Sequence, residues 1–158
     1  MGFFLPDNTR ETGFAVRLAW LYAAIFTLNG IQLPFFPVWL EAKGLDPGMI
    51  GLVLAAPMVV RVFAIPVATR AADRYEAIRA AIVVAMCLSV AGYVLVGLAE
   101  GAVAILLTFA LVSLAVTPVM PLTETYALRG LTARGRAYGP VRLWGSLAFI
   151  AGTFGAGY

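Results

Sequence analysis

Charged residues stand far apart in this chain and leave long apolar runs between them. No Asp, Glu, Lys or Arg occurs between Arg17 and Glu41, between Arg79 and Glu100, or between Glu100 and Glu124. Each run is close to the ~20 residues that a helix needs to cross ~30 Å of hydrocarbon. This spacing predicts a series of membrane-spanning helices.

Composition agrees with that prediction, because 62% of the residues are apolar and only 12% are charged. So little polar surface cannot cover a water-soluble globule. We therefore predict an all-α, polytopic membrane protein with about five spans. The expected spans are residues 16–40, 48–69, 80–99, 102–125 and 142–158. The last is short, at ~24 Å of helix from Leu143 onward, so we expect a truncated span and a fragment of a longer protein.

The loop arginines indicate an orientation. If the spans alternate in direction, one side of the membrane carries nine arginines and the other side only Lys43. This is the positive-inside pattern, so we expect a cytoplasmic N-terminus and a location in the inner (plasma) membrane. The net charge of +3 reflects that bias, and no nucleic-acid partner is expected. The nine are Arg10, Arg17, Arg70, Arg74, Arg79, Arg129, Arg134, Arg136 and Arg142.

Residues typical of soluble enzymes are missing from the sequence. It has no histidine and a single cysteine, Cys87, and it contains neither a nucleophile elbow nor a phosphate-binding glycine loop. We predict no enzymatic activity, no cofactor and no metal. The glycines and alanines of residues 80–99 and of the last run are instead typical of closely packed membrane helices.

Glu124 and Arg142 lie at the ends of two apolar runs, where charge is costly and marks candidate functional residues. The loop between the fourth and fifth spans is short, so both residues should lie at similar depth near the cytoplasmic side. A carboxylate and a guanidinium can neutralise each other there until a substrate displaces the pairing. A structural clamp, or interfacial charges that never meet, are the alternatives.

The surroundings of this pair indicate a polar passage. Pro118 and Pro121 precede Glu124 within two turns and should kink the fourth span. Phe149 follows Arg142 by seven residues, about two turns along the same helix face. Its ring could stack on a substrate or simply pack.

Three polar residues lie inside the first two spans. Arg61 is eight residues from the cytoplasmic end of its span, so it either faces a water-filled cavity and an anionic group or snorkels to the interface. Asn29 and Gln32 are three residues apart and share one helix face. They would bind either a substrate or a neighbouring helix.

Two loop regions complete the pattern. Pro34 and Pro37 predict a break in the first span near the outer interface, where the nearby aromatic residues would form a membrane belt. Asp73 and Arg74 lie in the charged loop after the second span. They either latch two helices on the cytoplasmic side or are simply solvated.

Three stretches give the chain a resemblance to the major facilitator superfamily of transporters, and within it to the phenylpropionate permease group and lactose permease. They are Leu-Pro-Phe-Phe-Pro-Val-Trp-Leu at 33–40, Pro-Leu-Thr-Glu at 121–124, and Tyr-Gly-Pro-Val-Arg-Leu-Trp-Gly-Ser at 138–146. The resemblance implies two six-helix halves with substrate bound between them, and residues 1–158 as part of the N-terminal half. The missing C-terminal half would be its partner. Of the superfamily loop signature, only Asp73-Arg74 is kept.

The resemblance also implies roles. As in lactose permease, Glu124 and Arg142 would hold the substrate and Phe149 would stack on it. It implies proton-coupled uptake across the inner membrane. Arg61 favours a small aromatic or other carboxylic acid, since a carboxylate gains from a second guanidinium. A sugar or nucleoside symporter is the alternative within the superfamily, and a small accessory membrane protein without transport activity is the alternative of another class.

Overall fold

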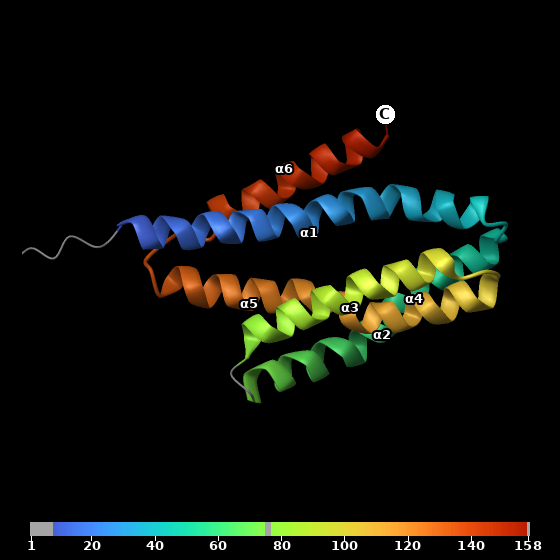
Figure 1. The fold of residues 1–158 in the computed structure, drawn as a ribbon, viewed down its shortest axis with the longest axis horizontal. Coiled ribbons are helices and arrows are strands. Elements are labelled where there is room, and N and C mark those ends of the chain that lie inside the picture. The colour runs from blue at the N-terminus through green and yellow to red at the C-terminus, as the bar shows by residue number, and fades with distance from the viewer. Residues whose placement is uncertain (1–7, 75–76, 158) are drawn as a thin grey trace, which may run out of the picture. The chain divides into compact units, whose positions relative to one another are not determined.

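The described part of the chain is helical throughout. The computed structural model describes residues 8–74 and 77–157, with side chains from residue 13 onward, and no strand occurs among them (Figure 1). This confirms the all-α prediction, while Tyr158 at the end of the last expected span lies outside the described residues. The helices are α1 (Asn8–Ala42), α2 (Pro47–Arg74), α3 (Ile78–Leu98), α4 (Ala102–Val116), α5 (Val119–Thr132) and α6 (Gly139–Ala156).

Four helical segments among the described residues are long and apolar enough to cross a membrane. They are Gly13–Ala42, Pro47–Arg74, Ile78–Leu98 and Ala102–Thr132. The fourth combines α4 and α5. The fifth expected span corresponds to α6, whose 18 residues begin with a glycine, a proline and the charged Arg142. That polar first turn lowers the hydropathy of α6, which is not among the four segments.

The chain divides into two compact units. The first unit contains Met1–Phe35 and Ala127–Tyr158, and the second contains Phe36–Tyr126. Helices α1 and α5 each contribute residues to both units.

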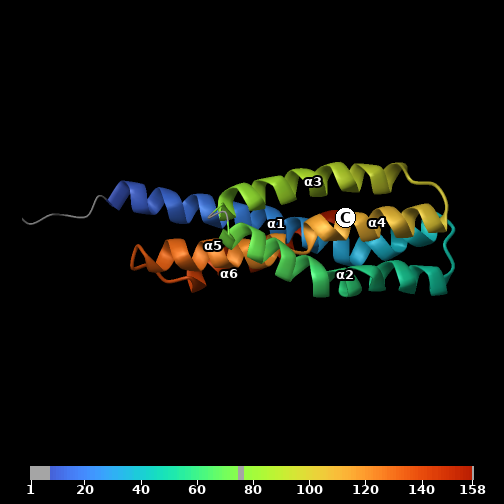
Figure 2. The same cartoon turned by 90° about the horizontal axis from the view of Figure 1, so that it is seen from below.

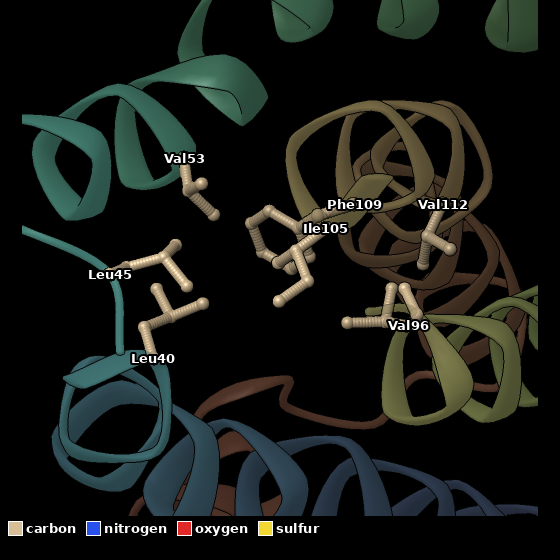
Figure 3. Close-up of a cluster of buried hydrophobic side chains, with 8 residues drawn as sticks. Leu40, Leu45, Val53, Val96, Ile105, Phe109 and Val112 are labelled. Carbon is tan, nitrogen blue, oxygen red and sulfur yellow. The ribbon is translucent and has the colours of Figure 1, made fainter. Parts of the chain in front are cut away.

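Helix α4 is the central element of the second unit. It packs against both α2 and α3, and Figure 2 shows it between them. One apolar cluster joins the start of α2, the end of α3 and the start of α4, so α3 runs antiparallel to the other two helices. Its buried residues, most of which are labelled in Figure 3, are Leu40, Leu45, Val53, Val96, Ala99, Ile105, Phe109 and Val112.

Phe36 and Trp39 pack on this cluster. The Phe36 ring lies 4.5 Å from the Phe109 ring and 5.7 Å from the Trp39 ring, between centroids. The Lys43 ammonium lies 5.4 Å from the Trp39 ring. Both rings are half-buried against protein, so they pack within the unit, and the membrane belt stays a prediction. Lipid offers no hydrophobic driving force for such contacts, so close packing of these side chains stabilises the unit.

The sequence predicts a kink at the prolines of the fourth expected span, and the helix is interrupted at this place. Helix α4 ends at Val116 and α5 begins at Val119, with Thr117 and Pro118 between them. Proline has no N–H group, so Pro118 and Pro121 each leave the carbonyl four residues earlier without its usual helical partner. Thr117 still has helical angles, with φ −59° and ψ −42°, so the backbone stays helical at the residue after α4.

The prediction that Pro34 and Pro37 break the first span is wrong. Helix α1 runs without interruption from Asn8 to Ala42. Pro34 cannot donate a hydrogen bond to the Gly30 carbonyl, but the Thr153 hydroxyl of α6 donates to that oxygen at 2.9 Å. A distant side chain thus replaces the missing backbone bond, which is how membrane helices tolerate proline.

Small residues bring α1 and α6 into close contact in the first unit. A Cβ atom at Gly30 would overlap the Phe149 carbonyl oxygen, and one at Gly152 would lie 2.8 Å from the Thr27 carbonyl oxygen. The expected role of small residues in helix packing is therefore confirmed at Gly152. It is wrong at Gly155, where a Cβ atom would meet nothing within 4 Å.

Candidate functional site

One face of α6 contacts α1 along its length. Tyr138 meets Tyr22, Gly145 meets the Phe26 ring, and Thr153 meets Gly30. In these three contacts the residue number rises along α1 and along α6 together. The two helices therefore run parallel, as Figure 1 also shows. This agrees with spans that alternate in direction, since α1 and α6 are the first and fifth. Arg142 follows Tyr138 by four residues and precedes Gly145 by three, so it shares this face of α6.

The Arg142 guanidinium is joined to α1 through two tyrosines. Its Nη1 donates to the Tyr138 hydroxyl at 3.4 Å, and the Tyr138 and Tyr22 hydroxyls are 3.2 Å apart. The guanidinium carbon also lies 6.0 Å from the centre of the Tyr138 ring, at the limit of a cation–π contact. Arg142 is exposed, whereas Tyr22 is fully buried. The predicted binding residue is therefore a surface cation connected to a buried polar group.

The other predicted residues of this unit line the same helix pair. Phe149 is half-buried, and its carbonyl oxygen approaches Gly30. Asn29 donates through Nδ2 to the Ile25 carbonyl of its own helix at 2.9 Å, and Gln32 is half-buried on α1. The bond of Asn29 within α1 favours a structural role for its amide. Substrate contacts for Gln32 and Phe149 stay predictions.

A groove of about 380 Å³ also lies in the first unit. Residues of α1, the end of α5 and the start of α6 line it, among them Val16, Arg136 and Trp144. Its walls are mainly apolar, and none of the predicted substrate residues lines it. The groove therefore does not bring the candidate residues together.

Glu124 lies on α5 in the second unit. Its neighbours Leu122 and Tyr126 share one face of α5 and pack with residues of α2 and α3, including Ala72 and Ile82. Glu124 is two residues from Leu122 and so about 200° around the helix, which turns its half-buried side chain away from α2 and α3. Arg142 belongs to the first unit, so the pairing of Glu124 with Arg142 stays a prediction.

Arg61 is exposed on α2. Its neighbours Met58, Val62 and Phe63 are also exposed, so Arg61 lies on an apolar outer face of its unit. A guanidinium held against hydrocarbon would be costly, and both the cavity and the snorkelling interpretation therefore stay open.

Asp73 and Arg74 are exposed at the end of α2. Arg74 lies in the last turn, where the helix dipole favours a cation. Residues 75–76 of the adjoining loop lie outside the described residues. The latch between helices stays a prediction.

No group of His, Cys, Asp or Glu residues suited to a metal ion occurs in the described parts of the chain.

Sequence reasoning missed two tyrosines and a threonine. Tyr138 precedes Arg142 by four residues, a helical spacing that could have drawn attention to it. Tyr22 gave no such signal, because it meets Tyr138 across 116 residues of sequence. Thr123, beside Glu124, is fully buried, and its hydroxyl has no hydrogen-bond partner among the described residues.

Four helical segments that are long and apolar enough to span a membrane indicate a multi-pass membrane protein. Residues 15–158 match the model of the MFS_1 like family. The chain therefore belongs to this family of the major facilitator superfamily, which confirms the resemblance seen in the sequence.

Two curated relatives agree with the family. The chain is 36% identical over 137 residues to the probable 3-phenylpropionic acid transporter of Escherichia coli (strain K12), covering 86% of this chain. It is 29% identical over 138 residues to a maltose permease of Geobacillus stearothermophilus, covering 87% of this chain. The chain spans only 36% and 35% of the length of these two proteins. No solved structure matches the chain significantly.

Proposed function

We propose that these residues form part of a secondary active transporter that takes up a small aromatic or other carboxylic acid across the inner membrane together with protons. In this proposal residues 1–158 are part of the N-terminal half of a twelve-helix fold. The remaining helices complete the substrate pathway, and rocking of the two halves exposes it alternately to each side.

The observation that supports an acid most strongly is the position of Arg142. Its guanidinium is exposed on the face of α6 that contacts α1, and the Tyr138 hydroxyl holds it. A guanidinium can offer two parallel hydrogen bonds to a carboxylate, a geometry that a neutral sugar cannot use in the same way. The relative with the higher identity of the two is named for an acid.

The other candidate residues take supporting roles in this proposal. Glu124 neutralises Arg142 until substrate arrives, and Phe149 stacks on the aromatic ring of the acid. Arg61 supplies a second positive charge from α2. Gln32 and, less directly, Asn29 complete the polar lining from α1.

A sugar is the second candidate substrate. The match to a maltose permease favours it, and an aromatic ring such as Phe149 suits the apolar face of a sugar. In that case Arg142 and Glu124 would hold hydroxyl groups, and an acid would have no advantage.

Uptake measurements distinguish these candidates. Cells that produce the full coding frame containing these residues are given labelled 3-phenylpropionate or labelled maltose, with and without a proton ionophore. We expect uptake of the acid that the ionophore abolishes. Uptake of maltose alone would instead establish the sugar candidate, and uptake of neither would support an accessory membrane protein.

Two conservative variants test the proposed residues. Glu124→Gln and Arg142→Lys keep the size of each side chain but remove the carboxylate charge or the bidentate geometry. Each should lower uptake at least tenfold, because a hydrogen bond to a charged group contributes about 1.5–3 kcal/mol. Undiminished uptake in both variants at normal protein levels would refute the site assignment.

The proposed orientation can be tested by labelling. In a Cys87→Ala background, cysteine is introduced at Lys43 or at Arg134, which the proposal places on opposite sides of the membrane. An impermeant maleimide added to intact cells should label the cysteine at position 43 and spare the one at 134. The reverse pattern would contradict a cytoplasmic N-terminus.

A further inference from the structure

Two tyrosines connect the exposed Arg142 side chain to the buried core of the first unit. The Tyr138 hydroxyl lies 3.4 Å from Arg142 Nη1 and 3.2 Å from the Tyr22 hydroxyl. We propose that Tyr138 and Tyr22 are positioning residues, which hold the Arg142 guanidinium in the orientation that receives the substrate carboxylate. This inference rests on the proposed function of Arg142.

Tyr138 is well placed to orient Arg142. The two residues are one helical turn apart, and the Arg142 backbone N–H donates to the Tyr138 carbonyl at 3.2 Å. The same residue thus accepts one hydrogen bond from the Arg142 backbone and one from its guanidinium. The ring of Tyr138, 6.0 Å from the guanidinium carbon, limits the side chain further.

Tyr22 in turn fixes Tyr138. Its side chain is fully buried on α1, and its ring meets the Tyr138 ring edge-on at 6.2 Å and 71°. The centre of the Phe26 ring, one turn further along α1, lies 6.1 Å from the centre of the Tyr22 ring. Rings packed in this way leave Tyr22 little freedom, so its hydroxyl is a fixed point for the chain of hydrogen bonds.

The hydroxyl of Tyr22 needs an explanation because phenylalanine would fill the same space. A buried hydroxyl is costly unless it finds a partner, and apolar packing alone would favour the residue without it. Tyr22 pairs with Tyr138, which a phenylalanine could not do. This pairing gives the buried Tyr22 hydroxyl a partner at Tyr138.

Ordering the guanidinium before substrate arrives would strengthen binding. A long arginine side chain loses rotamer freedom when it binds a ligand, and a preorganised side chain has less to lose. Loss of the ordering should therefore raise KM and leave the maximal uptake rate nearly unchanged. It should affect an acid far more than its uncharged amide.

The test uses single-hydroxyl deletions in the full protein that contains this chain. Tyr138→Phe should raise the KM for 3-phenylpropionate roughly three- to tenfold, and Tyr22→Phe should raise it by a smaller factor, as expected for one net hydrogen bond. Inhibition of uptake by 3-phenylpropionamide should not change in either variant. Tyr93→Phe, a half-buried tyrosine of α3, is the matched control and should behave as the wild type.

A double-variant cycle separates positioning from packing. If the tyrosines act through Arg142, then Tyr138→Phe added to Arg142→Lys should cause little further rise in KM. KM does not depend on the amount of protein in the membrane, so modest changes in folding do not obscure the result.

The outcomes distinguish this inference from the proposed function. If Arg142→Lys loses acid uptake but both tyrosine variants match Tyr93→Phe, the positioning role is wrong and the proposed function stands. An equal rise in the KM for the acid and in the inhibition constant of the amide would also overturn the inference. If Arg142→Lys keeps normal uptake, the binding role of Arg142 fails and the positioning role fails with it.

Discussion

Hydroxyl groups have different partners in the two units of the molecule. In the second unit, Ser89 and Ser113 are buried and donate to carbonyl oxygens four residues earlier in their own helices, at 2.6 and 2.7 Å. In the first unit, the Tyr22 hydroxyl pairs with Tyr138 at the start of α6. The Thr153 hydroxyl is shared between the Gly30 carbonyl of α1 at 2.9 Å and the Phe149 carbonyl of its own helix at 3.0 Å. Thr27 makes a longer contact of the same kind with the Ala148 carbonyl at 3.4 Å.

The difference bears on how the position of one helix relative to its neighbour is fixed. A hydroxyl that bonds its own helix is satisfied wherever that helix moves, so it does not fix the neighbouring helix. A hydroxyl that bonds the next helix specifies the register and the distance between the two. In the α1–α6 pair, which carries Arg142, polar contacts between the helices specify the register.

The largest loss of stability should come from a methyl group at Gly30, in the contact between α1 and α6. Gly30→Ala would overlap the Phe149 carbonyl oxygen, and a backbone atom cannot move aside without shifting α6. We expect a loss of about 1–3 kcal/mol in unfolding free energy, measured by denaturation of the purified protein in detergent.

Gly155→Ala is the matched control for this variant. It lies on α6 with open space at its Cβ position, and it should be neutral or slightly stabilising because alanine favours helix. Equal stability of the two variants would contradict the close contact between α1 and α6.

A smaller loss is expected at Gly92 in the second unit. A Cβ atom there would overlap the Val112 side chain rather than a backbone atom. Val112 can shift slightly within an apolar cluster, so Gly92→Ala should cost about 1 kcal/mol by the same denaturation measurement. If Gly92→Ala lost more unfolding free energy than Gly30→Ala, the contact between α1 and α6 would not be the less tolerant of the two.

The smallest effects should come from single hydroxyls. Thr153→Val leaves the Gly30 carbonyl without its donor and should cost about 0.6 kcal/mol and at most about 1.7 kcal/mol, the mean and the maximum found for hydrogen bonds between membrane helices. Ser113→Ala removes a bond within one helix and should cost less.

A second substitution sharpens the prediction for Thr153. Pro34→Ala restores a backbone N–H that can donate to Gly30, so Thr153→Val should cost less in that background than alone. Additive costs would show that Thr153 does not compensate for Pro34.

Much of the fold followed from local sequence, but the exceptions depended on distant residues. Apolar runs predicted the helices, and the prolines predicted a kink at the place where α4 ends and α5 begins, since both effects act within a few turns. The continuity of α1 through Pro34 could not be foreseen, because Thr153 supplies the missing bond from 123 residues away.

In the candidate site, too, contacts between distant residues could not be predicted from the sequence. Arg142 was evident as a charge beside an apolar run, and Tyr138 shares its helix face at a spacing that sequence can reveal. Tyr22 becomes visible only once α1 and α6 lie in parallel, because no local pattern connects it with Tyr138. The pairing of Glu124 with Arg142 and the cavity role of Arg61 stay predictions.

The central claim is that Arg142 receives the carboxylate of the substrate. The most direct test compares 3-phenylpropionate and 3-phenylpropionamide as inhibitors of labelled uptake, in the wild type and in Arg142→Gln. We predict that the wild type prefers the acid at least tenfold, as expected for a charge-assisted pair, and that Arg142→Gln loses this preference. An equal preference for the acid in both proteins would contradict the claim.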